Sequence, residues 1–222
     1  MAVNKEIYHQ IKTGLDANQV TLVAVSKTKP IEDILELYKL GQRDFGENYV
    51  QELVDKQSLL PKDIHWHFIG HLQSNKVKYI APFVHLIHGV DSLKLLKEIN
   101  KEALKHNRLI NVLLQVYIAQ EESKFGLDEN ELQLIISEFD KSEMKNVQIC
   151  GLMGMASFSN DMGKVRSEFK ILKSMFNKYS QPENLNLKFQ ILSMGMSADY
   201  ELAIEEGSTM VRIGSLLFGA RQ

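Results

Sequence analysis

The chain has 222 residues, of which 44% are hydrophobic and 24% charged, and its formal net charge at pH 7 is −2. This composition is typical of globular proteins, and the balance of 26 basic against 28 acidic residues argues against nucleic acid or an acidic membrane as the main partner. No apolar run approaches the ~20 residues of a membrane-spanning helix, and residues 1–14 lack the apolar core of a signal peptide. The single cysteine, Cys150, excludes an internal disulfide and a cysteine-rich zinc site. We therefore expect a cytoplasmic protein.

Segments typical of strands alternate with segments of helical period along the whole chain. After an amphipathic helix within residues 3–14, the predicted strands are 21–25, 43–48, 65–70, 84–90, 110–118, 147–153, 189–197 and 210–214. The predicted helices between and after them are 31–40, 49–60, 75–80, 92–106, 129–139, 165–179, 199–206 and a short one that begins at 215.

Regular strand–helix alternation predicts parallel strands joined by helical crossovers. Eight units of about 28 residues each are near the lower size of a (β/α)8 barrel. We therefore predict an α/β fold, a (β/α)8 TIM barrel, with residues 1–222 as a single domain. The competing architecture, a doubly wound sheet, favours Gly-x-Gly-x-x-Gly after its first strand, and residues 26–30 (SKTKP) lack that motif.

Lys27 follows the first predicted strand, and Pro30 then opens the next helix. A lysine at that place is partly shielded by the core, so its pKa is expected to fall toward neutrality. A neutral amine attacks an aldehyde to form a Schiff base. The alternative is a solvated lysine at a strand end, and the position of Lys27 alone does not decide between the two.

Small residues follow the last two strands, where barrels often bind phosphate. Gly195 and Ser197 end strand seven, and Gly214 and Ser215 precede the short final helix. Backbone N–H groups can approach an anion closely at such residues. A phosphate-bearing ligand held there would reach Lys27 with its other end, which is the arrangement that pyridoxal 5′-phosphate (PLP) needs. The alternative is that these glycines only serve tight turns.

Two other constellations are weaker. His65 and His67 lie on one face of a strand, with His71 close behind, and this spacing is used by metal sites. A metal-dependent hydrolase needs further ligands from later strands, and strands five to eight contain no histidine. We therefore expect no metal site, with His65 and His67 as half-buried polar residues beside Trp66. Cys150 lies in an apolar strand, where a thiol is usually core and not a nucleophile.

Six motifs extend over most of the chain: LVAVSK (22–27), FGENYVQE (45–52), WHFIGHLQSNK (66–76), GLMGMA (151–156), LSMGMSAD (192–199), and VRIGS with GAR (211–221). Together they resemble the pyridoxal phosphate homeostasis proteins, the YggS/PROSC family. These are single-domain relatives of the alanine racemase barrel domain, so the resemblance also implies the barrel fold.

The resemblance implies a role for most of the residues singled out above. The cofactor-binding set is Lys27 as the Schiff-base lysine, Asn48 and Met155 against the cofactor ring, Ser193, Gly195, Ser197, Gly214 and Ser215 around the phosphate, and Arg212 facing the pyridine nitrogen. An arginine stays protonated, so Arg212 cannot protonate the ring nitrogen as an aspartate partner does. The ring is then a weaker electron sink, which limits carbanion chemistry. Ser215 stands where threonine is common in the family, and both supply a hydroxyl.

The resemblance therefore implies a PLP-binding protein of intracellular PLP homeostasis that holds, buffers or delivers the cofactor with little or no catalysis. Alanine racemases carry a further β domain with a second base, and we expect none here because the sequence ends just past the eighth strand. The alternatives are a PLP-dependent amino-acid racemase and, less favoured, the metal-dependent hydrolase. The expected partners are PLP and, as recipients, PLP-dependent apoenzymes, with the chain as a monomer or weak dimer.

Overall fold

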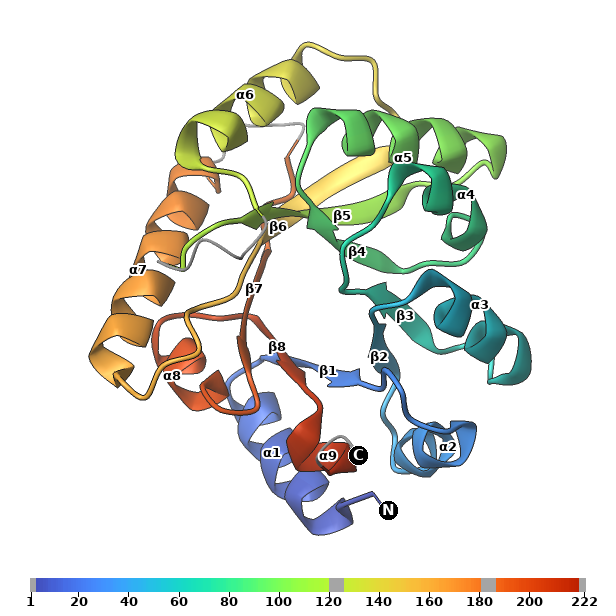
Figure 1. The fold of residues 1–222 in the computed structure, drawn as a ribbon, viewed down its shortest axis with the longest axis vertical. Coiled ribbons are helices and arrows are strands. Elements are labelled where there is room, and N and C mark those ends of the chain that lie inside the picture. The colour runs from blue at the N-terminus through green and yellow to red at the C-terminus, as the bar shows by residue number, and fades with distance from the viewer. Residues whose placement is uncertain (1–2, 120–125, 181–186, 220–222) are drawn as a thin grey trace.

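The computed structural model describes residues 3–119, 126–180 and 187–219 (Figure 1). In these residues eight parallel strands pair in chain order, and β8 pairs with β1 to close a barrel. The strands are β1 (Thr21–Val25), β2 (Asp44–Glu47), β3 (His65–Phe68), β4 (Leu86–Val90), β5 (Ile110–Val116), β6 (Val147–Gly154), β7 (Ile191–Met196) and β8 (Met210–Ile213). The (β/α)8 barrel predicted from the alternation of strands and helices is confirmed.

Helices surround the strands on the outside of the barrel (Figure 1). They are α1 (Lys5–Ala17), α2 (Ile31–Lys39), α3 (Val50–Leu59), η1 (Ser74–Lys76), α4 (Val77–Ile80), α5 (Leu93–Lys105), α6 (Glu129–Asp140), α7 (Met162–Tyr179), α8 (Tyr200–Glu205) and α9 (Ser215–Phe218). Within the described ranges, no helix has both the length and the apolar character needed to cross a membrane.

Most helix boundaries lie within two residues of the predicted ones, but α7 begins earlier than expected. The sequence predicted a start at Val165, whereas the helix begins at Met162. The Asp161 side chain explains the difference, because it accepts hydrogen bonds from the Gly163 and Lys164 amides and so caps the first turn.

The barrel has two separate cores. The larger one lies between the strands and the helices, and the smaller one fills part of the barrel interior with Val23, Leu86, Leu113, Cys150, Met153 and Met210. Successive side chains alternate between the two faces of a strand, so His88 shares the inner face with Leu86, and Arg212 shares it with Met210. Barrel interiors are usually filled by bulky apolar residues. Here charged and imidazole side chains occupy part of that space.

Candidate functional site

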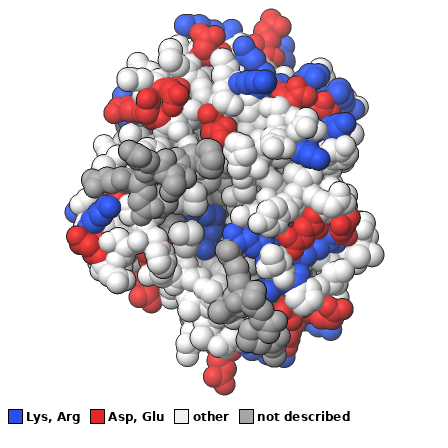
Figure 2. Space-filling view, in the orientation of Figure 1, with Lys and Arg blue, Asp and Glu red and all other residues white. Residues whose placement is uncertain are grey.

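A cavity of about 390 Å³ opens at the carboxyl ends of the strands, and its volume lies within the range of ~300–1,000 Å³ found for ligand pockets. Seven of the nine residues predicted for the site line it: Lys27, Asn48, Met155, Ser197, Arg212, Gly214 and Ser215. Lys29 is a further basic lining residue. Figure 2 shows Lys and Arg side chains at the recessed centre of the face that is also viewed in Figure 1.

The structure does not bring the other two predicted residues, Ser193 and Gly195, to the surface of this cavity. Ser193 is fully buried, and its hydroxyl accepts a hydrogen bond of 2.7 Å from Arg212 Nη1. Gly195 has φ +93°, and a Cβ there would lie 2.6 Å from the Cβ of Ala203. Both residues therefore lie behind the cavity wall. Ser193 faces Arg212 inside the barrel, and Gly195 packs against α8.

The loop that carries Lys27 is tethered on both sides of that residue. The Ser26 carbonyl accepts a hydrogen bond of 2.7 Å from Lys56 Nζ, and the Thr28 amide donates one of 2.6 Å to Glu52 Oε1. Thr28 adopts φ +62°, a conformation that costs a β-branched residue about 1–3 kcal/mol. The contacts from α3 therefore hold a strained turn in place, with Lys27 half-buried inside it.

A buried ion pair lies directly beneath this loop. Lys56 Nζ is 2.8 Å from Glu47 Oε1, and the side chains are only 7% and 0% exposed. Burial raises the pKa of Glu47, although Lys56 and the Ser26 hydroxyl act in the opposite direction. Sequence reasoning missed Lys56; the i,i+4 spacing of Glu52 and Lys56 on a predicted helix was the available signal. The lowered pKa expected for Lys27 itself remains a prediction.

Asn48 enters the cavity from the loop after β2. Its Oδ1 atom is buried and has no hydrogen-bond partner among the described residues. The loop after β3 packs tightly against it, since a Cβ on Gly70 would lie only 2.4 Å from the Asn48 carbonyl oxygen. A buried acceptor without a partner costs about 1–3 kcal/mol, so a donor supplied by a bound molecule would relieve this cost.

The opposite side of the cavity is built from small residues after β7 and β8. The Gly214 amide donates a hydrogen bond of 3.2 Å to Ser197 Oγ, which ties the two loops together. Lys29 Nζ donates one of 2.9 Å to the Phe218 carbonyl at the end of α9. Amides, hydroxyls and an ammonium group therefore converge here, as an anionic ligand requires.

Arg212 forms the floor of the cavity on β8. Its Nη1 donates to the Ser193 carbonyl at 2.9 Å and its Nη2 to the Gly154 carbonyl at 3.1 Å. Burial lowers the pKa of Arg212 to about 10. The guanidinium is therefore still protonated at neutral pH, and the bonds to β6 and β7 fix its plane.

A chain of polar contacts continues from Arg212 through the barrel interior. The Ser193 hydroxyl lies 3.3 Å from His88 Nδ1, His88 Nε2 lies 2.9 Å from His67 Nδ1, and His67 Nε2 lies 3.0 Å from Asp44 Oδ1. Asp44 begins β2, so the chain ends at the amino-terminal mouth of the barrel. The expectation of a half-buried His67 was wrong, because its side chain is only 1% exposed.

The two ends of this chain differ in kind, because arginine can only donate and a carboxylate can only accept. Burial lowers the pKa of His88 well below its usual value, so its ring is neutral and has one N–H donor and one acceptor nitrogen. One arrangement that satisfies the contacts has Ser193 donating to His88 Nδ1, His88 Nε2 donating to His67 Nδ1, and His67 Nε2 donating to Asp44.

The remaining candidates lie outside the cavity. Cys150 belongs to the inner core and is 8% exposed, and burial raises the pKa of its thiol to about 11, so the prediction of a core cysteine is confirmed. His71 lies on an exposed rim, where its Nδ1 is 3.3 Å from Asp91.

Comparison with known proteins agrees with this architecture. The family description "Alanine racemase, N-terminal domain" matches residues 5–222. A protein of Aquifex aeolicus named "Pyridoxal phosphate homeostasis protein" is 42% identical over 212 residues, which cover 95% of this chain and 91% of that protein. The chain belongs to the pyridoxal phosphate homeostasis protein family. The family resemblance predicted from the six motifs is therefore confirmed.

Other relatives extend this membership across distant organisms. The Homo sapiens pyridoxal phosphate homeostasis protein is 39% identical over 233 residues, covering 99% of this chain and 84% of the human one. The solved structure of PipY from Synechococcus elongatus, with PLP bound, superposes with a TM-score of 0.87 at 35% identity, covering 96% of this chain and 99% of that one.

Proposed function

We propose that the protein binds PLP in the cavity at the carboxyl ends of the strands and acts in PLP homeostasis. It holds, buffers or delivers the cofactor, with little or no catalysis of its own. The observation that carries this proposal is that one cavity joins Lys27 on the β1 loop, Arg212 on β8 and the small residues after β7 and β8. The names of the Aquifex and human relatives and the PLP in PipY support it.

The residues present fit the cofactor. Asn48 Oδ1 is a buried acceptor that needs a donor. Arg212 is a buried cation at the cavity floor, and Lys27 is the half-buried amine on the β1 loop. A ligand with one anionic end, one aldehyde and polar ring substituents matches these three groups at once, and PLP has all of them.

PLP supplies an aldehyde that condenses with a primary amine, and we assign that amine to Lys27. The ties of Ser26 to Lys56 and of Thr28 to Glu52 hold the lysine's backbone still. This preorganisation reduces the entropy lost when the ligand is bound.

We assign the phosphate to the side of the cavity formed by Ser197, Gly214 and Ser215, with Lys29 nearby. Ser193 and Gly195 act in this proposal as supports of the wall. Their predicted contact with the phosphate would require the wall to rearrange, since Ser193 is bonded to Arg212.

We propose that Arg212 donates a hydrogen bond to the ring nitrogen. A guanidinium has five N–H donors, and three contacts with Ser193 and Gly154 orient it. Because its pKa of about 10 keeps Arg212 protonated, the ring nitrogen stays unprotonated. Electron withdrawal by the ring is then weak, which suits retention of the cofactor better than turnover.

The amino-acid racemase alternative requires a second acid or base beside Lys27. Among the described residues that line the cavity, the titratable candidates are Lys29 and Asp199. Lys29 Nζ is bonded to the Phe218 carbonyl, and Asp199 Oδ1 accepts the Met196 amide. Both side chains therefore already hold loop structure. Incubation with L- and D-alanine decides the point: turnover near the enzyme median of ~10 per second would overturn the homeostasis proposal.

The decisive experiment for cofactor binding is a visible absorption spectrum before and after borohydride reduction. Wild type loaded with PLP should show a band that reduction removes, with the cofactor then fixed to Lys27 in a peptide map. Lys27→Ala should show no fixed cofactor. Lys39→Ala is the control, because it removes an exposed amine at the end of α2 that does not line the cavity, and it should keep the band. Fixation at another lysine in wild type would contradict the assignment.

The recipients of the cofactor, PLP-dependent apoenzymes, follow from the delivery role and are part of the same proposal. The monomer or weak dimer and the cytoplasmic location expected from the sequence remain predictions.

A further inference from the structure

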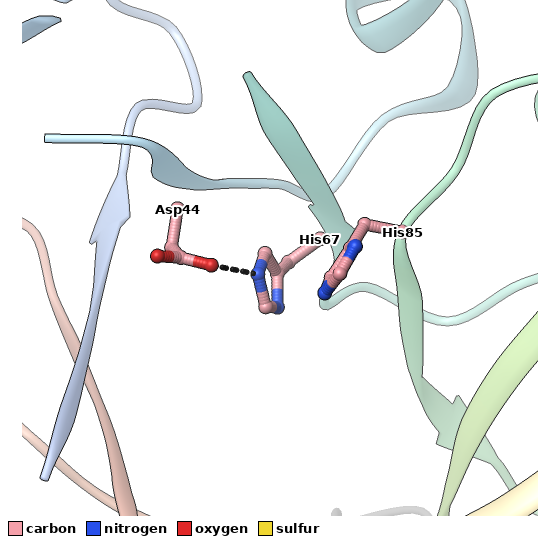
Figure 3. A group of neighbouring side chains, drawn as sticks. All are labelled: Asp44, His67 and His85. Atoms are coloured by element: carbon pink, nitrogen blue, oxygen red, sulfur yellow. Dashed lines mark hydrogen bonds and ion pairs between the residues drawn. The ribbon is translucent and has the colours of Figure 1, made fainter. Parts of the chain in front are cut away.

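A second cluster of ligand-type side chains lies at the amino-terminal mouth of the barrel, at the opposite end from the cavity. It consists of Asp44 at the start of β2, His67 in β3 and His85 immediately before β4. One potential ligand atom from each of these residues lies within 4.8 Å of the other two. Figure 3 shows the Asp44 carboxylate facing one edge of the His67 ring, with the His85 ring on its other side.

The register of three neighbouring strands creates this cluster. Asp44 pairs with His65, and His67 pairs with Leu86. The side chains of His65 and His67 both reach the same Asp44 oxygen, Oδ1, at 3.2 and 3.0 Å. The sequence-based argument against a metal site looked for ligands on later strands, whereas the structure supplies them from β2 and from the residue before β4.

The spacing matches the requirements of a transition-metal ion. Zinc binds imidazole nitrogen and carboxylate oxygen at roughly 2.0–2.2 Å, so two ligand atoms of one tetrahedral ion lie about 3.3 Å apart. Asp44 Oδ1 and His67 Nε2, at 3.0 Å, are already close to that separation. His85 is solvent-exposed, so rotation of its ring can bring its ligand atom nearer without disturbing the core.

One of the donor atoms is also held in place. His67 Nδ1 lies 2.9 Å from His88 Nε2, and a metal-bound histidine is usually oriented by such a second partner.

We propose that Asp44, His67 and His85 bind a divalent transition-metal ion, with zinc as the best match to one carboxylate and two imidazoles. The ion takes the place of the proton on His67 Nε2, and the neutral His67 ring then carries its proton on Nδ1 and donates it to His88 Nε2. The proton of His88 then lies on its Nδ1 and is donated to the Ser193 hydroxyl oxygen. Three protein ligands leave an open coordination position for water. The proposal does not rest on PLP binding, because no residue of this cluster lines the upper cavity.

The test uses full-length protein without a histidine tag, treated with a chelator and then titrated with Co²⁺, whose visible absorption reports coordination by the protein. Wild type should bind one Co²⁺ per chain, and Zn²⁺ should displace it. His85→Ala should lower the affinity at least tenfold, and Asp44→Asn should do the same. His106→Ala is the matched control, an exposed histidine at the end of α5, and should bind as wild type does.

Two results would overturn the metal site. The first is the lack of a saturable Co²⁺ or Zn²⁺ signal in wild type. The second is equal affinity in wild type and His85→Ala. Circular dichroism of each variant shows whether it is folded. His85 is exposed, so His85→Ala remains decisive if the more buried Asp44→Asn variant does not fold.

Discussion

The two mouths of this barrel differ in the sign of the ligand that they suit. At the carboxyl end, Lys27, Lys29 and Arg212 line the cavity and supply hydrogen-bond donors. At the amino end, the Asp44 carboxylate and the exposed His85 ring supply acceptor atoms, while the His67 ring is buried. One interior chain of contacts from Arg212 to Asp44 joins the two mouths.

The contrast lies in the groups at the two ends of the interior chain. Arg212 can only donate hydrogen bonds and the Asp44 carboxylate can only accept them. The donor end suits the anion proposed for the carboxyl mouth, and the acceptor end suits the metal ion proposed for the amino mouth.

The largest expected effect is the loss of ligand binding at one mouth while binding at the other mouth is unchanged. Lys27→Ala should abolish borohydride-fixed PLP and leave Co²⁺ stoichiometry unchanged. His85→Ala should weaken Co²⁺ binding and leave PLP fixation unchanged, because His85 lies outside the interior chain and the cavity. Both readouts are made on wild type and on both variants, with and without each ligand. Loss of both activities in either variant would mean that the two mouths form one unit.

The sequence predicted the carboxyl mouth far better than the amino mouth. Strand ends can be recognised from apolar runs, and the barrel fold places their carboxyl ends at one rim. Lys27, Asn48 and Arg212, which were expected there, all line one cavity. The cluster of Asp44, His67 and His85 depends instead on strand register, which the spacing within one strand does not reveal.

The burial of Ser193 and Gly195 was also beyond the sequence. Both follow the same small-residue pattern as Ser197, which does not reveal that Ser193 bonds to Arg212 and that Gly195 packs against Ala203 of α8. A partial signal for the interior chain existed in β3, where His65 and His67 alternate with Trp66 and Phe68. Its meaning required knowing that β2 and β4 lie on either side of β3.

The next largest effect concerns the buried ion pair under the Lys27 loop. Lys56→Met leaves Glu47 buried without its cation, and breaking such a pair costs about 3–5 kcal/mol of unfolding free energy. Urea denaturation at pH 7 measures this loss. Lys62→Met, at an exposed lysine beyond the same helix, is the control and should change little.

The cost in Lys56→Met should shrink at acidic pH. Burial raises the pKa of Glu47 above its unfolded value, and loss of Lys56 raises it further. A group whose folded pKa is raised contributes most to stability below the unfolded pKa, near 4.5, and loses this contribution as the pH rises through the folded pKa. The difference in unfolding free energy between wild type and Lys56→Met should therefore be smaller at pH 5 than at pH 7. A constant difference would show that Glu47 is not the group responsible.

A smaller effect is expected in the middle of the interior chain. His88→Leu leaves His67 Nδ1 without a partner, while the Ser193 hydroxyl keeps only its bond from Arg212, and an unsatisfied buried polar group costs about 1–3 kcal/mol. The variant should remain folded and lose about that much stability in urea. A more informative measurement is PLP fixation at the carboxyl mouth, because Arg212 keeps its bonds to the Ser193 and Gly154 carbonyls in this variant. PLP should therefore still be fixed at Lys27, and loss of fixation would mean that the chain, and not the two carbonyls, holds Arg212.

The smallest effect is expected at Cys150, which lies in the apolar part of the barrel interior between the two mouths. Its burial raises the thiol pKa to about 11, and only the thiolate reacts with disulfide reagents. Native protein at pH 8 should therefore release almost no chromophore from such a reagent, whereas protein in denaturant should release one equivalent. PLP or Zn²⁺ should not change the native rate, since Cys150 lines neither site. Rapid native labelling would mean that the barrel interior opens to solvent.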